Sequence, residues 1–420
     1  MTTAAGNGCP QRLVSLDVFR GLTIAGMILV NNPGDWGHVY APLRHATWNG
    51  WTPTDLVFPF FLFIVGVAMA FSFDRRRAQG TGRVTLFGQV VRRSIILFAL
   101  GLIMAGFPDW RLTGPYLLMI LGAGLLAAKS RPVRMTGALV LLGGIAFFVA
   151  DFNYFDQSKL RVPGVLQRIA VCYFFASLIV LTADTRGRVC CALLAIIGYW
   201  VIMKTCAAPA GYNAPVASAD GLLNDWIDAK LLGAHVYRER PDPEGLLSTL
   251  PAIATVLLGV LTGQWLKSAR EPAEKAAGLF FAANLMLLAG VCMDYGFPIN
   301  KKIWTSSYVV FTAGMAMNFL AMCYWLVDVK RIRIWSWPFV VFGTNAILVY
   351  FASGIAARMM GRWKLHPAGG DIALKTWLYQ KLFASWAEPT NASLLFALSF
   401  VLVWLVLLIP LYRRRIFIKI

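Results

Sequence analysis

The residues most suited to chemistry lie between the first two apolar segments of the chain. His45 stands at the start of a stretch rich in Trp and Asn that leads to Asp55. A histidine can accept and return protons near neutral pH, particularly when a carboxylate fixes its tautomer. We interpret His45 as a candidate general base and Asp55 as the carboxylate that orients it, although the spacing alone leaves that pairing open.

Two further groups belong to the first apolar segment itself. The segment ends at Asn31 and Asn32, whose amides either cap a helix or donate hydrogen bonds within a site. Near its start, Asp17 and Arg20 lie three residues apart and share one helix face. They form either a neutralising pair or an electrostatic element in which Arg20 pairs with an anionic ligand.

These side chains must be positioned by a membrane-spanning fold. Of the 420 residues, 58% are hydrophobic and only 14% are charged, against about 25% charged in an average soluble domain. The apolar residues fall in blocks of about 20, the length needed to cross ~30 Å of hydrocarbon. A soluble globule is therefore excluded, and we expect an all-α polytopic transmembrane bundle.

Twelve apolar segments are candidate spans, of which we expect 10 to 12 to cross the membrane. They cover residues 14–31, 53–73, 89–107, 115–128, 133–150, 164–182, 189–206, 247–266, 276–293, 304–327, 336–357 and 392–412. The segment 115–128 is the shortest and the least secure. We predict one transmembrane domain over 13–420, with a short tail at 1–12 and a long loop at 204–246. The amphipathic stretch 371–387 is expected to lie in the membrane interface.

The charges predict an orientation for this bundle. The chain has 39 Lys and Arg against 20 Asp and Glu, a net charge of +19. One set of alternate loops, which includes the N-terminal tail, carries basic residues at about three times the density of the other set. Both termini are therefore predicted to be cytoplasmic, and all four histidines, His38, His45, His235 and His366, to face the opposite side. Membrane orientation explains the basic excess, so no nucleic-acid partner is expected.

Several polar groups occur at or inside the ends of other spans. Arg168 lies one turn inside the sixth segment, where it needs an acidic or carbonyl partner or must reach the interface. Asp242, Glu244 and Lys301 are further polar residues at span ends, each more often structural than catalytic when considered singly. The seven cysteines show no metal-ligand spacing, so we predict no metal site and no disulfide framework.

Taken together and in order, separated motifs of this chain resemble the catalytic region of the heparan-alpha-glucosaminide N-acetyltransferase family. They are Leu16-Asp17-Val18-Phe19-Arg20-Gly21, Val30-Asn31, His45-Ala46-Thr47-Trp48-Asn49-Gly50, Asp55-Leu56-Val57-Phe58-Pro59, Arg161-Val162-Pro163-Gly164-Val165-Leu166-Gln167-Arg168, Asp242-Pro243-Glu244-Gly245, Asn300-Lys301, Val327-Asp328-Val329-Lys330 and Leu411-Tyr412-Arg413. The resemblance therefore covers nearly the whole chain.

The resemblance implies an enzyme that moves an acetyl group from cytoplasmic acetyl-CoA to the amine of a glucosamine-type sugar across the membrane. The family's essential histidine corresponds to His45, and an important asparagine corresponds to Asn31. We expect His45 to act as the base, Asp55 to orient it, and Asn31 to donate to the oxyanion or the thioester carbonyl. A covalent acetyl-His45 intermediate is the alternative route. Neither route requires a metal.

Binding residues for both substrates can be nominated on the same basis. Coenzyme A carries phosphates, so its head group needs basic side chains. The candidates are Arg20, the run Arg75 to Arg77, Arg92, Arg93, Arg168 and Lys330. For the acceptor sugar, the candidates are Trp48, Asn49, Asp242, Glu244 and Lys301. Membrane orientation and the interfacial aromatic belt explain many of these residues equally well.

The chain departs from the lysosomal enzyme in two ways. Only about a dozen residues precede the first span, and 115–128 with 133–150 form an extra apolar pair. We therefore expect a bacterial inner-membrane relative that acts on a periplasmic amino sugar or cell-wall fragment. Two other functions stay open: a sugar transporter or channel without chemistry, and a membrane O-acyltransferase acting on a cell-envelope glycan. The expected surroundings are a lipid bilayer, and homodimerisation is left open.

Overall fold

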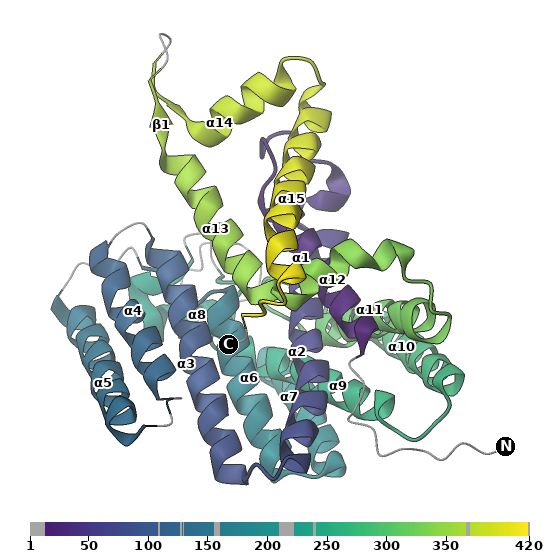
Figure 1. Ribbon diagram of the computed structural model, residues 1–420. Coiled ribbons are helices and arrows are strands. Elements are labelled where there is room, and N and C mark those ends of the chain that lie inside the picture. Colours follow the sequence, from purple (N-terminus) through teal and green to yellow (C-terminus); the bar gives the residue numbers. More distant parts are fainter. Residues whose placement is uncertain are drawn as a thin grey trace.

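The computed structural model describes residues 13–107, 110–126, 128, 130–154, 160–209, 222–237, 241–366 and 370–418. Within these ranges the chain is a helical bundle with one short antiparallel hairpin, β1 (Lys364–Leu365) and β2 (Ile372–Ala373) (Figure 1). Its α-helices are α1 (Val14–Asn31), α2 (Pro53–Ala78), α3 (Arg83–Gly106), α4 (Trp110–Leu125), α5 (Arg131–Tyr154), α6 (Val165–Thr182), α7 (Thr185–Thr205), α8 (Leu222–Leu232), α9 (Thr249–Leu266), α10 (Pro272–Asp294), α11 (Ser306–Tyr324), α12 (Trp337–Thr344), α13 (Ala346–Arg362), α14 (Leu374–Tyr379) and α15 (Pro389–Arg413).

The predicted polytopic membrane architecture is confirmed in its class. Among the described residues, nine helices are long and apolar enough to cross a membrane, or ten if one bent pair is a single span. The segment predicted at 115–128 forms a shorter apolar helix, Thr113–Leu125. The predicted tail at 1–12 lies outside the described residues, as do residues 210–221 and 238–240 of the predicted loop 204–246. The described part of that loop contains the helix α8, for which the sequence gives no prediction.

The candidate span at 336–357 is not one continuous helix. The structure has two helices there, α12 and α13, whose axes bend by 74° at Asn345. The Asn345 side chain binds the C-terminal segment instead of continuing the helix: Nδ2 donates to Ile416 O at 3.1 Å, and Oδ1 accepts from Ile418 N at 2.9 Å. Hydropathy cannot detect this break, because the apolar residues continue on both sides of the asparagine.

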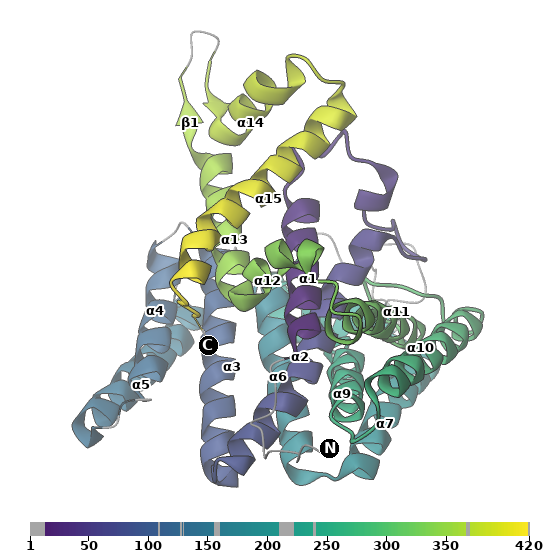
Figure 2. The same ribbon diagram turned by 45° about the vertical axis from the view of Figure 1, so that its right-hand side comes forward.

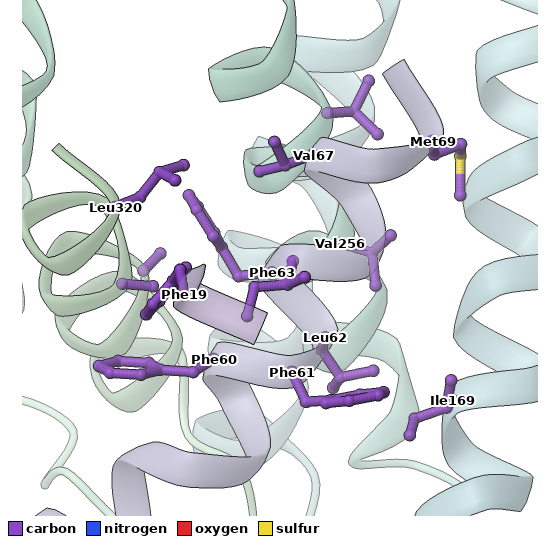
Figure 3. Packing of buried hydrophobic residues seen from close by; sticks show 14 of the residues in the cluster. Phe19, Phe60, Phe61, Leu62, Phe63, Val67, Met69, Ile169, Val256 and Leu320 are labelled. Atoms are coloured by element: carbon purple, nitrogen blue, oxygen red, sulfur yellow. The ribbon is translucent and has the colours of Figure 1, made fainter. Parts of the chain in front are cut away.

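Helix α2 occupies the centre of the bundle and determines where the candidate site lies. Its start is fixed by Pro53 in the first turn and by a capping box between Thr52 and Asp55. Its last turn carries Arg75, Arg76 and Arg77, whose charges suit the negative end of the helix dipole. Phe60 of α2 packs against Phe19 of α1, with ring centroids 5.4 Å apart. Ile169 of α6 and Val256 of α9 belong to the same buried cluster (Figure 3).

Glycines allow α2 and α9 to approach closely. Gly259 and Gly263 are spaced as in a GxxxG pattern. A Cβ at Gly259 would lie 2.1 Å from the backbone oxygen of Phe63. The contact is reciprocal, because a Cβ at Gly66 would lie 2.0 Å from the backbone oxygen of Val256. The backbones therefore touch without intervening side chains, as in small-residue contacts between membrane helices.

We expect Gly259→Ala to destabilise the protein by roughly 1–3 kcal/mol, because the new methyl group forces the two backbones apart. Thermal unfolding of the detergent-solubilised protein measures this change. The matched control is Gly198→Ala on α7, where an added Cβ meets nothing within 4 Å. Equal melting temperatures for the two variants would show that α2 and α9 do not need this close approach.

Helices α13 and α15 extend beyond the rest of the bundle, and α14 with the β hairpin connects their far ends (Figures 1 and 2). This connection is the stretch predicted to be amphipathic at 371–387. It forms α14 followed by a π-helical turn, Gln380–Ala384. Tyr379 packs edge-on against Phe396 of α15, with ring centroids 6.4 Å apart. The apolar face of the stretch is therefore partly covered by α15.

Candidate active site

His45 and Asp55 form a direct contact. Nδ1 of His45 lies 2.6 Å from Oδ1 of Asp55. The Asp55 side chain is 1% exposed, whereas that of His45 is 49% exposed. The carboxylate is thus inaccessible to a substrate, while the imidazole can reach one. The structure brings together the two residues whose pairing the sequence left open.

The backbone around Asp55 holds its carboxylate rigidly. Oδ2 accepts hydrogen bonds from Ala46 N at 3.0 Å and from Thr52 N at 3.1 Å. The carbonyl oxygen of Asp55 accepts a further hydrogen bond from Tyr308 Oη at 2.5 Å. The same carboxylate therefore caps α2, orders the loop that carries His45, and leaves Oδ1 for the imidazole.

Lys301 is the third charged member of this group. Its Nζ lies 3.0 Å from His45 Nδ1 and 3.2 Å from Asp55 Oδ1. Lys301 comes from the segment between α10 and α11, far in sequence from the other two residues. Burial lowers the pKa of Lys301, although the charges of Asp55 and Glu244 act in the opposite direction. The ammonium is therefore held in place chiefly by Asp55.

A cavity of about 430 Å³ opens beside His45, and we call it the histidine cavity. Of the predicted residues, it is lined by Asn31, His45, Trp48, Asp55, Glu244 and Lys301. The other lining residues that carry polar groups are Thr47, Thr54, Arg161, Tyr237 and Lys302. The end of α1, the start of α2 and the segments before α6, α9 and α11 thus converge on one chamber.

Glu244 is anchored in the cavity wall by Arg161. Nη2 of Arg161 contacts Oε2 of Glu244, and the guanidinium also binds Asp242 through Nε at 3.0 Å. Burial opposes the charge of Arg161, but Glu244 and Asp242 outweigh it and raise the arginine pKa. Asp242 is buried behind the wall and also accepts from Tyr237 N at 2.6 Å. Its contacts make it a support for Arg161 rather than a lining group.

Asn49 and Trp48 have different positions although they are neighbours. Trp48 lines the cavity, and the Lys302 ammonium lies 5.7 Å from its ring centroid. Asn49 is not among the described lining residues, and its Oδ1 accepts from Asn300 Nδ2 at 3.2 Å. Asn49 therefore ties the histidine loop to the segment that carries Lys301.

A second cavity of about 500 Å³ lies further along the same helices, and we call it the arginine cavity. Four arginines line it: Arg20, Arg75, Arg76 and Arg93. Arg20 also donates to Asp17 Oδ1 at 3.2 Å and to Gly343 O at 3.1 Å. The guanidinium carbon of Arg93 lies 4.7 Å from the Tyr173 ring centroid. This concentration of arginine suits a ligand with several phosphates.

Four other candidates for coenzyme A binding lie elsewhere. Arg77, Arg92 and Lys330 are not among the described residues lining the arginine cavity, and the Lys330 ammonium lies 4.9 Å from the Trp325 ring centroid. Arg168 is fully buried and donates to Gly245 O at 2.8 Å and to Ser248 Oγ. Its contacts hold the segment that follows Glu244.

Helices α1, α2 and α6 line both cavities. On α2 the lining passes from Phe58 in the histidine cavity to Phe61 in the arginine cavity, and on α6 it passes from Val165 to Ile169. At 1.5 Å per residue, these steps are only about 4.5–6 Å along the helix axes. α2 packs against both of the other helices (Figure 2). The two cavities are therefore consecutive chambers along one helix triplet.

Comparison with known proteins identifies the family of this chain. Residues 12–292, two thirds of the chain, match the family described as heparan-alpha-glucosaminide N-acetyltransferase, catalytic. The chain belongs to this family. It is 28% identical over 464 residues to the Homo sapiens heparan-alpha-glucosaminide N-acetyltransferase, and 27% identical over 463 residues to that of Mus musculus. Each alignment covers 98% of this chain but only 60% and 61% of the relative, respectively.

Within this heparan-alpha-glucosaminide N-acetyltransferase fold, several site residues were not nominated from the sequence. Arg161 belongs to one of the family motifs, but its two acidic partners lie about 80 residues away in sequence. Tyr308 lies inside an apolar segment and carries no signal of its contact with Asp55. Tyr237 and Lys302 complete the cavity wall. The sequence signal that points to Arg161 is the carboxylate pair Asp242 and Glu244 near a span end, since two such carboxylates need a nearby cation.

Proposed function

We propose that this protein transfers an acetyl group from cytoplasmic acetyl-CoA to the amine of a glucosamine-type sugar on the opposite side of the membrane. The observation that carries the proposal is the alignment of the two cavities along α1, α2 and α6. One cavity holds four arginines, and the other holds a histidine paired with a carboxylate. Transfer across a membrane needs a donor site and a reaction site that follow one another along the same helices.

In this proposal, the arginine cavity binds the coenzyme A head group. Its guanidiniums supply paired donors for phosphate oxygens. The pantetheine arm then runs between α1, α2 and α6, and brings the thioester to the histidine cavity. Asn31, at the end of α1, faces this chamber and donates to the thioester carbonyl oxygen as negative charge develops there.

The chemistry then requires one base beside the acceptor amine. The sugar ammonium first loses one proton to solvent water, and the neutral nitrogen attacks the carbonyl carbon of the thioester. His45 Nε2 takes the second proton from this nitrogen as the C–N bond forms. The C–S bond breaks, and the coenzyme A thiolate receives that proton from the imidazolium. Asp55 keeps the Nδ1 proton in place throughout. Formation of acetyl-His45 followed by attack of the amine is the alternative order of steps.

The orientation that we propose for the protein in its membrane is based on the charge distribution. The arginine cavity lies toward the set of loops with the high density of Lys and Arg, which we assign to the cytoplasm together with both termini. We place the protein in a bacterial inner membrane, where the histidine cavity opens to the periplasm. Its acceptor is then a periplasmic amino sugar or a de-acetylated cell-wall fragment.

Purified protein incubated with labelled acetyl-CoA and a panel of acceptors tests this function. The panel is glucosamine, chitosan oligomers and de-acetylated muropeptides, with the fully N-acetylated forms as matched controls. Label should move to the free amines and not to the acetylated sugars. Labelling of the acetylated forms would instead indicate O-acyl transfer, and sugar flux into proteoliposomes that is independent of acetyl-CoA would indicate a transporter.

The donor site makes a separate prediction. We expect Arg93→Met to raise the KM for acetyl-CoA by about tenfold, because loss of a charge-assisted hydrogen bond costs about 1.5–3 kcal/mol. The KM for the acceptor should stay unchanged. Arg92→Met is the matched control, since Arg92 is adjacent on α3 but outside the described lining of the cavity. Equal effects of the two substitutions on the KM for acetyl-CoA would contradict this assignment.

A further inference from the structure

Three polar atoms in the histidine cavity lie within hydrogen-bond distance of one another. They are His45 Nδ1, Asp55 Oδ1 and Lys301 Nζ, with separations of 2.6, 3.0 and 3.2 Å. The Lys301 side chain is 18% exposed, so its charge is only partly screened by water. In the described part of the chain, Nε2 of His45 has no hydrogen-bond partner. An ammonium is thus directly against the imidazole, on the side away from its free nitrogen.

This arrangement addresses a difficulty of the His45–Asp55 pair. A buried carboxylate beside an imidazole favours the protonated imidazolium, because opposite charges attract strongly in a poorly hydrated site. An imidazolium cannot accept a proton from an acceptor amine. A second cation that shares the same carboxylate oxygen opposes this protonation, because two positive charges would then lie about 3 Å apart.

The other groups facing His45 do not replace Lys301 in this role. The remaining charged or titratable side chains lining the cavity are Arg161, Tyr237, Glu244 and Lys302. Arg161 and Glu244 contact each other, and Lys302 lies against Trp48. Of the lining cations among the described residues, only Lys301 contacts both Asp55 and the imidazole.

We propose that Lys301 is a positioning residue that keeps His45 neutral, with the Nδ1 proton on the Asp55 side and Nε2 free to act as the base. This role rests on the proposed function of His45. It differs from acceptor binding, because the lysine charge acts on the protonation of the histidine. Lys301 neither gives nor takes a proton in the reaction. It only alters the pH range in which His45 can accept a proton.

The pH dependence of His45 modification by diethyl pyrocarbonate tests the proposal directly, since the reagent attacks the neutral imidazole. Peptide mass spectrometry follows His45 separately from the other three histidines. In Lys301→Met the carboxylate acts unopposed, imidazolium persists to higher pH, and the midpoint of modification should rise by about one pH unit or more. Lys301→Gln, which keeps a donor for Asp55 without the charge, should raise it in the same direction.

Two controls separate charge from structure. Lys301→Arg retains the positive charge and should restore the wild-type midpoint. Lys204→Met removes a lysine outside the described lining of the histidine cavity and should leave the midpoint unchanged. The acid limb of kcat/KM should move with the modification midpoint. An unshifted midpoint in both uncharged variants overturns the proposal, as does a higher KM for the acceptor with an unshifted pH profile. The modification reaction needs neither acetyl-CoA nor sugar. Its result is therefore independent of whether the protein acetylates an amine.

Discussion

Replacing His45 with alanine is expected to lower kcat for acetyl transfer by on the order of 10²–10⁴-fold, the usual contribution of a positioned general base. The histidine is 49% exposed and lines the cavity, so it is accessible to the acceptor amine. The arginine cavity contains none of the groups that this substitution changes, and therefore the affinity for acetyl-CoA should stay near that of the wild type. Single-turnover transfer and equilibrium binding of acetyl-CoA measure the two quantities separately.

The chain offers a matched control for this substitution. His38 also contacts a carboxylate through Nδ1, Asp35 Oδ2 at 2.6 Å, and lies in the same loop. It is not among the described residues that line the histidine cavity. His38→Ala should therefore retain transfer, and comparable losses in the two variants would mean that loop order, rather than proton transfer, sets the rate.

The membrane class and much of the histidine cavity could be predicted from the sequence because their signals are local. Apolar blocks of spanning length report helices directly. His45 and Asp55 stand ten residues apart in one loop and cap, so a short stretch of sequence contains both partners. Family motifs then nominated residues from distant segments, and Asn31, Glu244 and Lys301 do meet at one chamber.

The features that could not be predicted from the sequence depend on contacts between residues far apart in the chain. At the bend, the amide of Asn345 binds the C-terminal segment, about 70 residues later in the chain. Arg168 has the same charge as Arg93, yet one contacts backbone behind the histidine cavity and the other lines the arginine cavity. The packing of α6 against its neighbours determines which arginine lies beside which cavity. Residue type alone carries no information on this packing.

The second large effect is expected for Asp55→Asn, which preserves side-chain shape but removes the charge. We expect kcat to fall by up to about 10⁴-fold, as when a histidine base is left in the wrong tautomer. Oδ2 of Asp55 accepts from Ala46 N and Thr52 N, and Oδ1 faces His45 Nδ1. An asparagine that keeps its oxygen on the two backbone donors must point its NH₂ group at the imidazole.

Nδ1 then becomes an acceptor, the ring proton moves to Nε2, and the base has no free electron pair for the acceptor amine. The opposite amide orientation places NH₂ against Ala46 N and Thr52 N, which leaves two backbone donors unpaired at the start of α2. The substitution also removes the partner of Lys301.

Asp35→Asn is the matched control, because Asp35 pairs with His38 in the same way outside the cavity. A wild-type kcat for Asp55→Asn with an unchanged melting temperature would show that the carboxylate sets neither the tautomer of His45 nor the start of α2. A large loss of kcat with normal acetyl-CoA binding would place its effect on the base, because the arginine cavity, which we propose as the donor site, lies further along α2 and is not lined by residues of the capping box.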